Sequence, residues 1–240
     1  MSAPKVLVVL TSHDKLGDTG KPTGWYLSEF AHPYDVLNSA SVSLTVASPR
    51  GGLSPVDPSS IDAAKDDSIS TNFINSPSTK PLFEQTLPLS DFVGNPSAIA
   101  PFAAIFFPGG HGPMFDLATD PQSQQLIREF WDAGKVVAAV CHGPAALVNV
   151  KLADGSHLLK GRKVTGFTNE EEDMVQLSKF MPFMLEDKLK EAVGPEGAFE
   201  KAPSAWGEKV VVDAEGRLIT GQNPASATGV GKAILKAISS

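Results

Sequence analysis

Short, uninterrupted apolar runs recur along this chain at intervals wide enough to hold a helix between them. The clearest runs span residues 5–10, 43–47, 103–107 and 136–140, and residues 164–167 form a weaker fifth. Runs of this length without polar alternation are typical of strands buried on both faces of a parallel sheet. We therefore predict an α/β fold in which a mostly parallel sheet carries helices on both faces.

Helical patterns fill the intervals between these runs. Residues 121–133 form the clearest pattern, because a proline suits its first turn and Gly134 suits its end. We predict a second helical region over residues 23–38, interrupted near Pro33, which would begin a new helix there. A closing helix is predicted over residues 224–238.

Two further segments complete this plan. Residues 209–213 and 217–220 flank a turn that contains glycine, which predicts a β-hairpin. Residues 53–101 are rich in Ser, Asp, Pro and Asn, and we expect an irregular insertion with short helices there. We interpret residues 1–240 as a single domain, which a chain of this length can form.

Charge and cysteine content argue against several classes of function. The formal net charge is −7 and the basic residues are scattered, whereas nucleic-acid binding needs a concentrated basic face. A single cysteine cannot form an intramolecular disulfide, which argues against a secreted scaffold. No apolar stretch reaches the about 18 residues of a membrane span, and residues 1–10 lack signal-peptide features. We expect a cytoplasmic or nuclear protein that binds neither nucleic acid nor membrane.

The single cysteine stands where an apolar run ends. Cys141 follows residues 136–140 and precedes His142 and a Gly-Pro pair. A strand-to-helix turn of this kind presents its side chain at the carboxyl edge of the sheet, where open α/β folds place their sites. The N-terminus of a following helix would favour the thiolate. A lone cysteine is otherwise a small buried apolar residue, but these neighbours favour a nucleophile.

The residues around Cys141 resemble the nucleophile elbow of the superfamily that contains the parkinsonism-associated deglycase, the ThiJ/PfpI proteins and the class I glutamine amidotransferases. Further segments match the heat-shock chaperone and glyoxalase III branch, especially its fungal members, in order and spacing. The matching segments are residues 5–12, 24–33, 110–116, 138–144, 166–168 and 220–227. The resemblance implies a flavodoxin-like three-layer sandwich with the nucleophile elbow at the C-terminal end of a central strand. It is poorest over residues 53–101.

The resemblance also implies which residues act. Cys141 would attack an aldehyde carbonyl, and His142 would serve as general base and acid. Glu29 would be a buried acid beside the sulfur. A carboxylate after the Gly-Phe-Thr motif would orient the histidine, and the spacing favours Glu172, with Glu170 as the alternative.

Simpler roles compete with these assignments. Glu29 could face solvent from its helix, as most glutamates do. The acids of residues 170–173 could form the charged first turn of a helix that is capped by Thr168 or Asn169. We assign that simpler role to Glu171 and Asp173.

The remaining histidines and glycines have more modest expected roles. Gly110 and His111 are expected to line the pocket, with backbone N–H groups near a developing oxyanion. His32 is expected to help end a helical turn before Pro33. The five histidines show no pair at metal-ligand spacing, so we predict no metal site.

The resemblance implies a glutathione-independent glyoxalase, a lactate-forming dehydratase that converts methylglyoxal through a cysteine hemithioacetal. No cofactor is expected, because one carbon of the small 2-oxoaldehyde is oxidised as its neighbour is reduced. Relatives are commonly homodimers, and some act as chaperones in stress. Two alternatives stay open: a cysteine peptidase or amidohydrolase, and a non-enzymatic holdase that binds through an apolar patch such as residues 180–184. Oxidation of Cys141 is a side prediction.

Overall fold

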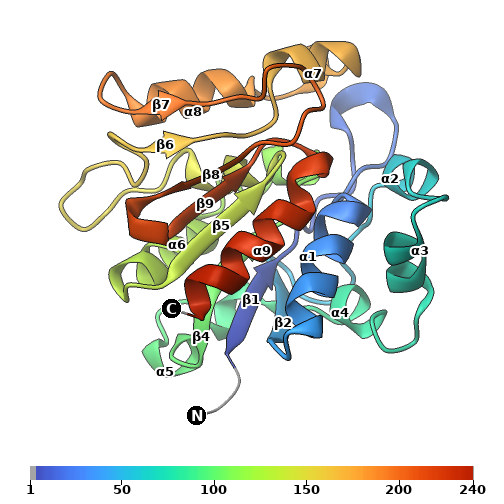
Figure 1. The fold of residues 1–240 in the computed structure, drawn as a ribbon, viewed down its shortest axis with the longest axis horizontal. Coiled ribbons are helices and arrows are strands. Elements are labelled where there is room, and N and C mark those ends of the chain that lie inside the picture. Colours follow the sequence, from blue (N-terminus) through green and yellow to red (C-terminus); the bar gives the residue numbers. More distant parts are fainter. Residues whose placement is uncertain (1–3, 240) are drawn as a thin grey trace.

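The computed structural model describes residues 4–239, so residues 1–3 of the N-terminal segment and residue 240 lie outside it. Its centre is a seven-stranded sheet in the order β3-β2-β1-β4-β5-β9-β8 (Figure 1). The strands are β1 (Lys5–Val9), β2 (Ser43–Ser48), β3 (Leu87–Pro88), β4 (Phe102–Phe107), β5 (Val136–Val140), β8 (Val210–Asp213) and β9 (Leu218–Gly221). Every pair of neighbours is parallel except β8 and β9, which are antiparallel. The predicted mostly parallel sheet is confirmed.

The central strands show why their sequences lack polar alternation. All five residues of β5 are buried, and β1 and β4 each have only one residue that is not. Both faces of these strands are covered, so each position needs an apolar side chain.

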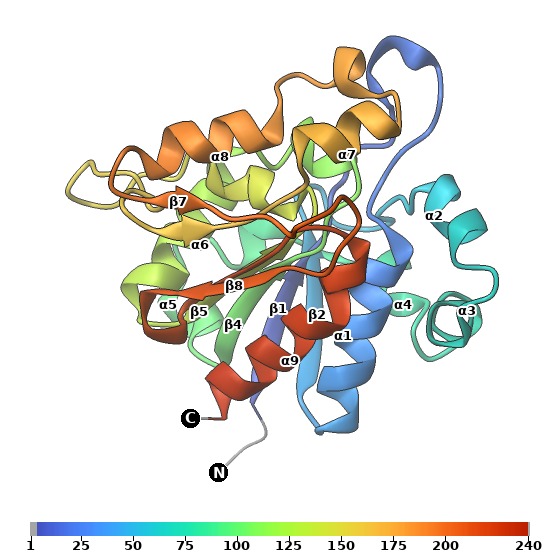
Figure 2. The ribbon, with the colours of Figure 1, turned by 45° about the horizontal axis from the view of Figure 1, so that its top comes forward.

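Three long helices supply that cover. They are α1 (Leu27–Ser39), α6 (Pro121–Asp132) and α9 (Ala227–Ile238). Helices α1 and α9 pack side by side across one face, and α6 lies on the opposite face (Figures 1 and 2). The result is a three-layer sandwich. Among residues 4–239, no helix combines the length and the apolar character that a membrane span requires.

The predicted interruption at Pro33 is wrong. The helix runs through Pro33, while the preceding residues 23–26 are not helical. A proline inside a helix removes one backbone hydrogen bond, here the one to the carbonyl of Glu29. Close packing compensates, because a side chain at Gly231 of α9 would place its Cβ 2.9 Å from the Pro33 Cα. Tertiary packing therefore keeps the helix continuous.

The segment 53–101 contributes one short edge strand, β3, and several short helices. Its helices are α2 (Pro58–Ala63), α3 (Ser68–Asn75), α4 (Pro81–Glu84) and α5 (Pro96–Ile99). His32, which was expected to end a helical turn, instead lies inside α1. Its ring nitrogens lie 2.7 Å from Asp67 Oδ2 and 2.9 Å from Thr228 Oγ1. These contacts connect α1 to the N-terminus of α3 and to α9.

A smaller group of elements, outside the three layers, covers the carboxyl ends of the main strands (Figure 2). It consists of α7 (Asn169–Met174), α8 (Leu185–Val193), β6 (Lys163–Val164) and β7 (Ala198–Phe199). The expected strand at residues 164–167 is wrong for its last three residues, and β6 pairs with β7 outside the main sheet. The Thr165 N–H donates to Thr220 Oγ1 instead, and the Phe167 N–H donates to the Cys141 carbonyl. Residues 165–167 therefore pass over the carboxyl ends of β5 and β9 and do not add a strand to the main sheet.

The predicted hairpin and two predicted helix ends agree with the structure. Positive φ angles at residues 214–216 form the turn between β8 and β9. Asp120 caps α6 and Gly134, with φ 72°, follows it. The 3₁₀ helices are η1 (Gly17–Thr19), η2 (Leu89–Asp91), η3 (Gly112–Met114), η4 (Gly143–Leu147), η5 (Ser178–Phe180), η6 (Ala214–Gly216) and η7 (Pro224–Ser226).

Candidate active site

Cys141 occupies a strained turn directly after β5. Its φ is 59°, a left-handed conformation that costs a residue with a side chain roughly 1–2 kcal/mol. Two backbone hydrogen bonds of 2.9 Å hold it there, one donated by Cys141 to the Gly221 carbonyl and one accepted from Phe167. The turn presents the sulfur at the carboxyl edge of the sheet, as expected for a nucleophile elbow.

The glycine pair after β4 lets the backbone approach this turn. A Cβ at Gly109 would lie 2.6 Å from the His142 nitrogen and 2.7 Å from Glu29 Oε2. Gly110 has φ 85°, and a Cβ there would lie 2.4 Å from the Gly24 carbonyl oxygen. Neither position therefore accommodates a side chain. The Gly110 N–H faces the Cys141 sulfur and lowers its pKa against the larger opposing effects described below.

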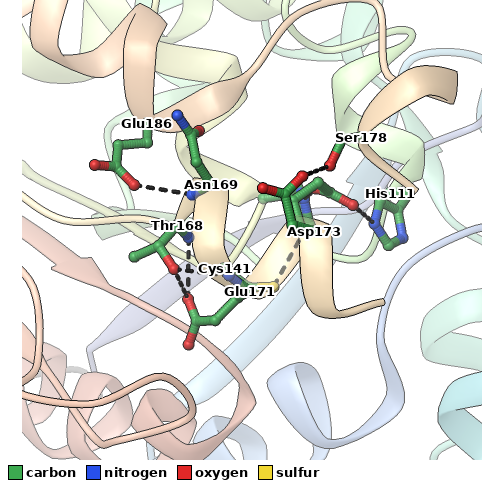
Figure 3. A network of polar contacts seen from close by, with 10 residues as sticks. His111, Cys141, Thr168, Asn169, Glu171, Asp173, Ser178 and Glu186 are labelled. Carbon is green, nitrogen blue, oxygen red and sulfur yellow. Dashed lines mark hydrogen bonds and ion pairs between the residues drawn. The ribbon is translucent and has the colours of Figure 1, made fainter. Parts of the chain in front are cut away.

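Cys141, His142 and Glu172 form a chain of polar contacts. The Cys141 Sγ lies 3.4 Å from His142 Nδ1, and His142 Nε2 lies 2.6 Å from Glu172 Oε2. The other carboxylate oxygen, Oε1, lies 3.0 Å from His111 Nε2. Figure 3 shows Cys141 and His111 around helix α7, which carries Glu172. Glu170, the alternative partner of the histidine, is exposed and makes none of these contacts.

Glu172 determines which nitrogen of His142 can accept a proton. Its pKa is held well below the usual range by the two histidines, although burial alone would raise it. The ionised carboxylate accepts the Nε2 proton, so the Nδ1 lone pair faces the thiol. Burial and the neighbouring His111 lower the pKa of His142, which is therefore a neutral base at neutral pH.

Glu29 is fully buried beside the sulfur rather than at the surface. Burial raises its pKa to about 8, although its Oε2 accepts a 2.8 Å hydrogen bond from the Gly109 N–H. The side chain is therefore protonated at neutral pH. Its second oxygen, Oε1, is buried and has no hydrogen-bond partner of standard geometry within residues 4–239, while the carboxyl group interacts with the Cys141 sulfur.

The resting thiol differs from the expected thiolate. Burial, followed by the neighbouring Glu29, raises the pKa of Cys141 well above its usual value. The following helix, η4, is a five-residue 3₁₀ helix and cannot offset this burial. Cys141 is 3% exposed, so the accessible low-pKa thiolate assumed for ready oxidation is absent. The thiol needs a base to become a nucleophile, and His142 Nδ1 is in place for that.

Glu171 is a structural residue that the sequence did not reveal. Its Oε2 forms a capping box with Thr168 (Figure 3). Its Oε1 accepts hydrogen bonds from Trp206, Gln222 and Asn223. It is fully buried, whereas the sequence suggested only a charged first helical turn. The [ST]-x-x-E signature of a capping box was its only detectable signal. Glu171 thereby fixes the start of α7 and the position of its neighbour Glu172.

His111, Cys141 and His142 face a cavity of about 650 Å³. The lining includes Tyr26, Gly110, His111, Cys141, His142, Phe167 and Trp206. The histidine rings pack against each other with centroids 4.3 Å apart, and Phe167 packs on His142 at 4.4 Å. All the site residues expected from the sequence thus lie together, from four separate segments. Glu170 and Asp173 are exposed and lie outside this set.

Comparison with known proteins places this architecture among characterised relatives. The chain is 32% identical to Glyoxalase 3 of Candida albicans, covering 97% of this chain and 98% of that one. The crystal structure of glyoxalase III from Candida albicans aligns with a TM-score of 0.81 at 28% identity, covering 98% and 97% of the two chains. The Rapid Encystment Protein 24 kDa of Francisella tularensis aligns with a TM-score of 0.88 at 36% identity, covering 98% and 99%. A model of the DJ-1/PfpI family matches residues 23–237, and the chain therefore belongs to the DJ-1/PfpI family.

Proposed function

We propose that this protein is a glutathione-independent glyoxalase that converts methylglyoxal to lactate. The observation that carries the proposal is the Cys141–His142–Glu172 chain beside the protonated Glu29, in a chain alike over its full length to a protein named Glyoxalase 3. A small 2-oxoaldehyde needs a nucleophile, a proton carrier and an acid, and these groups supply all three.

The first step is attack of the Cys141 sulfur on the aldehyde carbon, C1. His142 Nδ1 takes the thiol proton as the C–S bond forms, and then returns it to the new alkoxide oxygen. The Gly110 N–H, which faces the sulfur, stabilises negative charge on that oxygen. The product is a hemithioacetal with a neutral His142.

The second step moves hydrogen from C1 to C2. His142 Nδ1 abstracts the C1 proton, and the electron pair forms a C1–C2 double bond as the C2 carbonyl becomes an enediol oxygen. We assign Glu29, which is protonated and lies beside the sulfur, as the donor of a proton to that oxygen. His142 returns its proton to C2, and the C1 hydroxyl proton passes to Glu29 as the C1 carbonyl of a thioester forms. Water then cleaves the thioester to lactate and free Cys141. C1 is oxidised as C2 is reduced, so the electrons balance within the substrate.

The cellular location and the oligomeric state belong to the same proposal. The unpaired Cys141 suits a reducing compartment, and we assign the protein to the cytoplasm. A homodimer is proposed from the resemblance, and sedimentation of the purified protein measures it. For the holdase alternative, Met181 and Phe183 of the suggested apolar patch pack against the core instead of lying exposed.

Lactate formation in buffer free of glutathione tests the proposed function directly. The native protein is expected to convert methylglyoxal to lactate, which NMR spectroscopy detects without a coupling enzyme. Added glutathione is expected to leave the rate unchanged, because the hemithioacetal forms on Cys141. A folded protein that yields no lactate, or that needs glutathione, would rule the proposal out.

Replacing Glu172 by Gln is expected to lower kcat about 100- to 10,000-fold. The amide loses the charge that holds the His142 tautomer, and comparable losses follow removal of the orienting carboxylate in catalytic triads. Glu170→Gln is the matched control, because Glu170 is exposed two residues away and should leave kcat unchanged. Equal effects of the two substitutions would contradict the assignment of Glu172.

A further inference from the structure

His111, His142 and Glu172 carry side-chain atoms that can bind a metal ion. One ligand atom from each of His111, His142 and Glu172 lies within 4.8 Å of the other two, and both histidines contact the Glu172 carboxylate through Nε2. They come from the loop after β4, the elbow after β5 and helix α7, so no short sequence spacing reveals them. Two imidazoles and one carboxylate form a ligand set that suits Zn²⁺ with a fourth position left open.

The Glu172 carboxylate already brings the two histidines together. Ligands of a tetrahedral Zn²⁺ with bonds of about 2.0–2.2 Å lie about 3.4 Å apart. Glu172 Oε1 and Oε2 already lie 3.0 and 2.6 Å from the two Nε2 atoms. A bound ion would lie between the carboxylate and the two rings, in place of these contacts.

The cluster is reachable from solvent and held in place. The His111 side chain is 14% exposed, whereas those of His142 and Glu172 are 1% and 5% exposed. His111 thus lies at the cavity side, which gives an ion an entry path and leaves its fourth position to water. Phe167 packs against both histidine rings and limits their movement.

We propose that His111, His142 and Glu172 form an inhibitory Zn²⁺ site within the active site. A metal on His142 Nε2 uses the lone pair there, so the ring proton must move to Nδ1. Nδ1 then faces Cys141 as an N–H and cannot accept the thiol proton. Zinc binding therefore removes the base by changing the tautomer, without blocking the sulfur itself. Only this inhibitory consequence rests on the proposed glyoxalase function; the binding site does not.

Isothermal titration with Zn²⁺ after chelator treatment tests the site independently of activity. We expect one ion per native chain and at least about 100-fold weaker binding to His111→Gln, since even outer-shell changes cost 10- to 100-fold. His13→Gln is the control, because it removes a histidine outside the cluster, and we expect native affinity. Cys141→Ser should also bind like the native protein. Native affinity in His111→Gln, or no binding to the native chain, would overturn the proposal.

A zinc-soaked crystal gives the second measurement. We expect an anomalous difference peak within about 2.0–2.2 Å of both Nε2 atoms and a Glu172 oxygen. We also expect the native glyoxalase rate to fall with Zn²⁺ and to recover fully with chelator. A peak elsewhere, or bound zinc at this site without inhibition, would contradict the inhibitory site. Failure of the proposed function would instead appear as no turnover in chelator-treated protein.

Discussion

Cys141→Ser is expected to abolish lactate formation, lowering kcat/KM at least about 1,000-fold. A serine hydroxyl ionises far less readily than a thiol, and the neutral His142 is a weak base that cannot activate it to the same extent. The substitution nearly conserves size, and the two backbone hydrogen bonds that hold residue 141 do not involve its side chain. The loss should therefore be one of turnover and not of folding.

Steady-state kinetics together with a thermal melt separates these effects. The melting midpoint of Cys141→Ser should stay within a few degrees of the native value while lactate formation disappears. The same variant distinguishes the holdase alternative, because protection of an aggregating client protein would not need the sulfur. Substantial lactate formation by folded Cys141→Ser would place the chemistry at another residue.

Glu29→Gln is expected to remove a large pH dependence of the free energy of unfolding. In the folded protein the pKa of Glu29 is raised from 4.5 to about 8. Between these values the folded protein keeps the proton that the unfolded chain loses, so this group makes the native protein less stable as pH rises from 4.5 to 8. The linked difference amounts to roughly 4–5 kcal/mol across the window. Glutamine cannot lose a proton and should not show this decline.

Urea unfolding at pH 5, pH 6.5 and pH 8 measures the effect. Relative to the native protein, Glu29→Gln should gain stability steadily as pH rises, with the largest gain at pH 8. Glu170→Gln is the control for loss of one exposed carboxylate. A constant difference between Glu29→Gln and native protein across these pH values would mean that Glu29 is ionised in the fold, contrary to the burial argument.

The strands and the elbow were predictable because their signals are local. Residues 136–140 must be apolar wherever both faces are covered, and Cys141 follows them directly. The spacing favours Glu172 as the acidic partner but leaves Glu170 as an alternative, because the two residues differ only in the helix face they occupy. The structure separates them by burial: Glu172 is 4% exposed and Glu170 lies at the surface.

The features that sequence could not predict depend on distant neighbours. Pro33 stays inside a helix because Gly231, nearly 200 residues away, allows close packing. Residues 165–167 leave the strand conformation because Thr220 and Cys141 receive their hydrogen bonds. Likewise, the charge state of Cys141 follows from burial beside Glu29, which no property of the elbow motif encodes.

The neutral resting state of Cys141 limits its reaction with electrophiles other than the substrate. A permanent thiolate would react with many alkylating compounds and oxidants that happened to collide with it. Here the sulfur is buried and protonated, and its activation requires a proton transfer to His142 within a confined cavity. Reactivity is thus conditional on a carbonyl compound small enough to enter and polar enough to engage the surrounding donors. The protein can therefore keep its single cysteine unreactive until a suitable carbonyl compound enters the cavity.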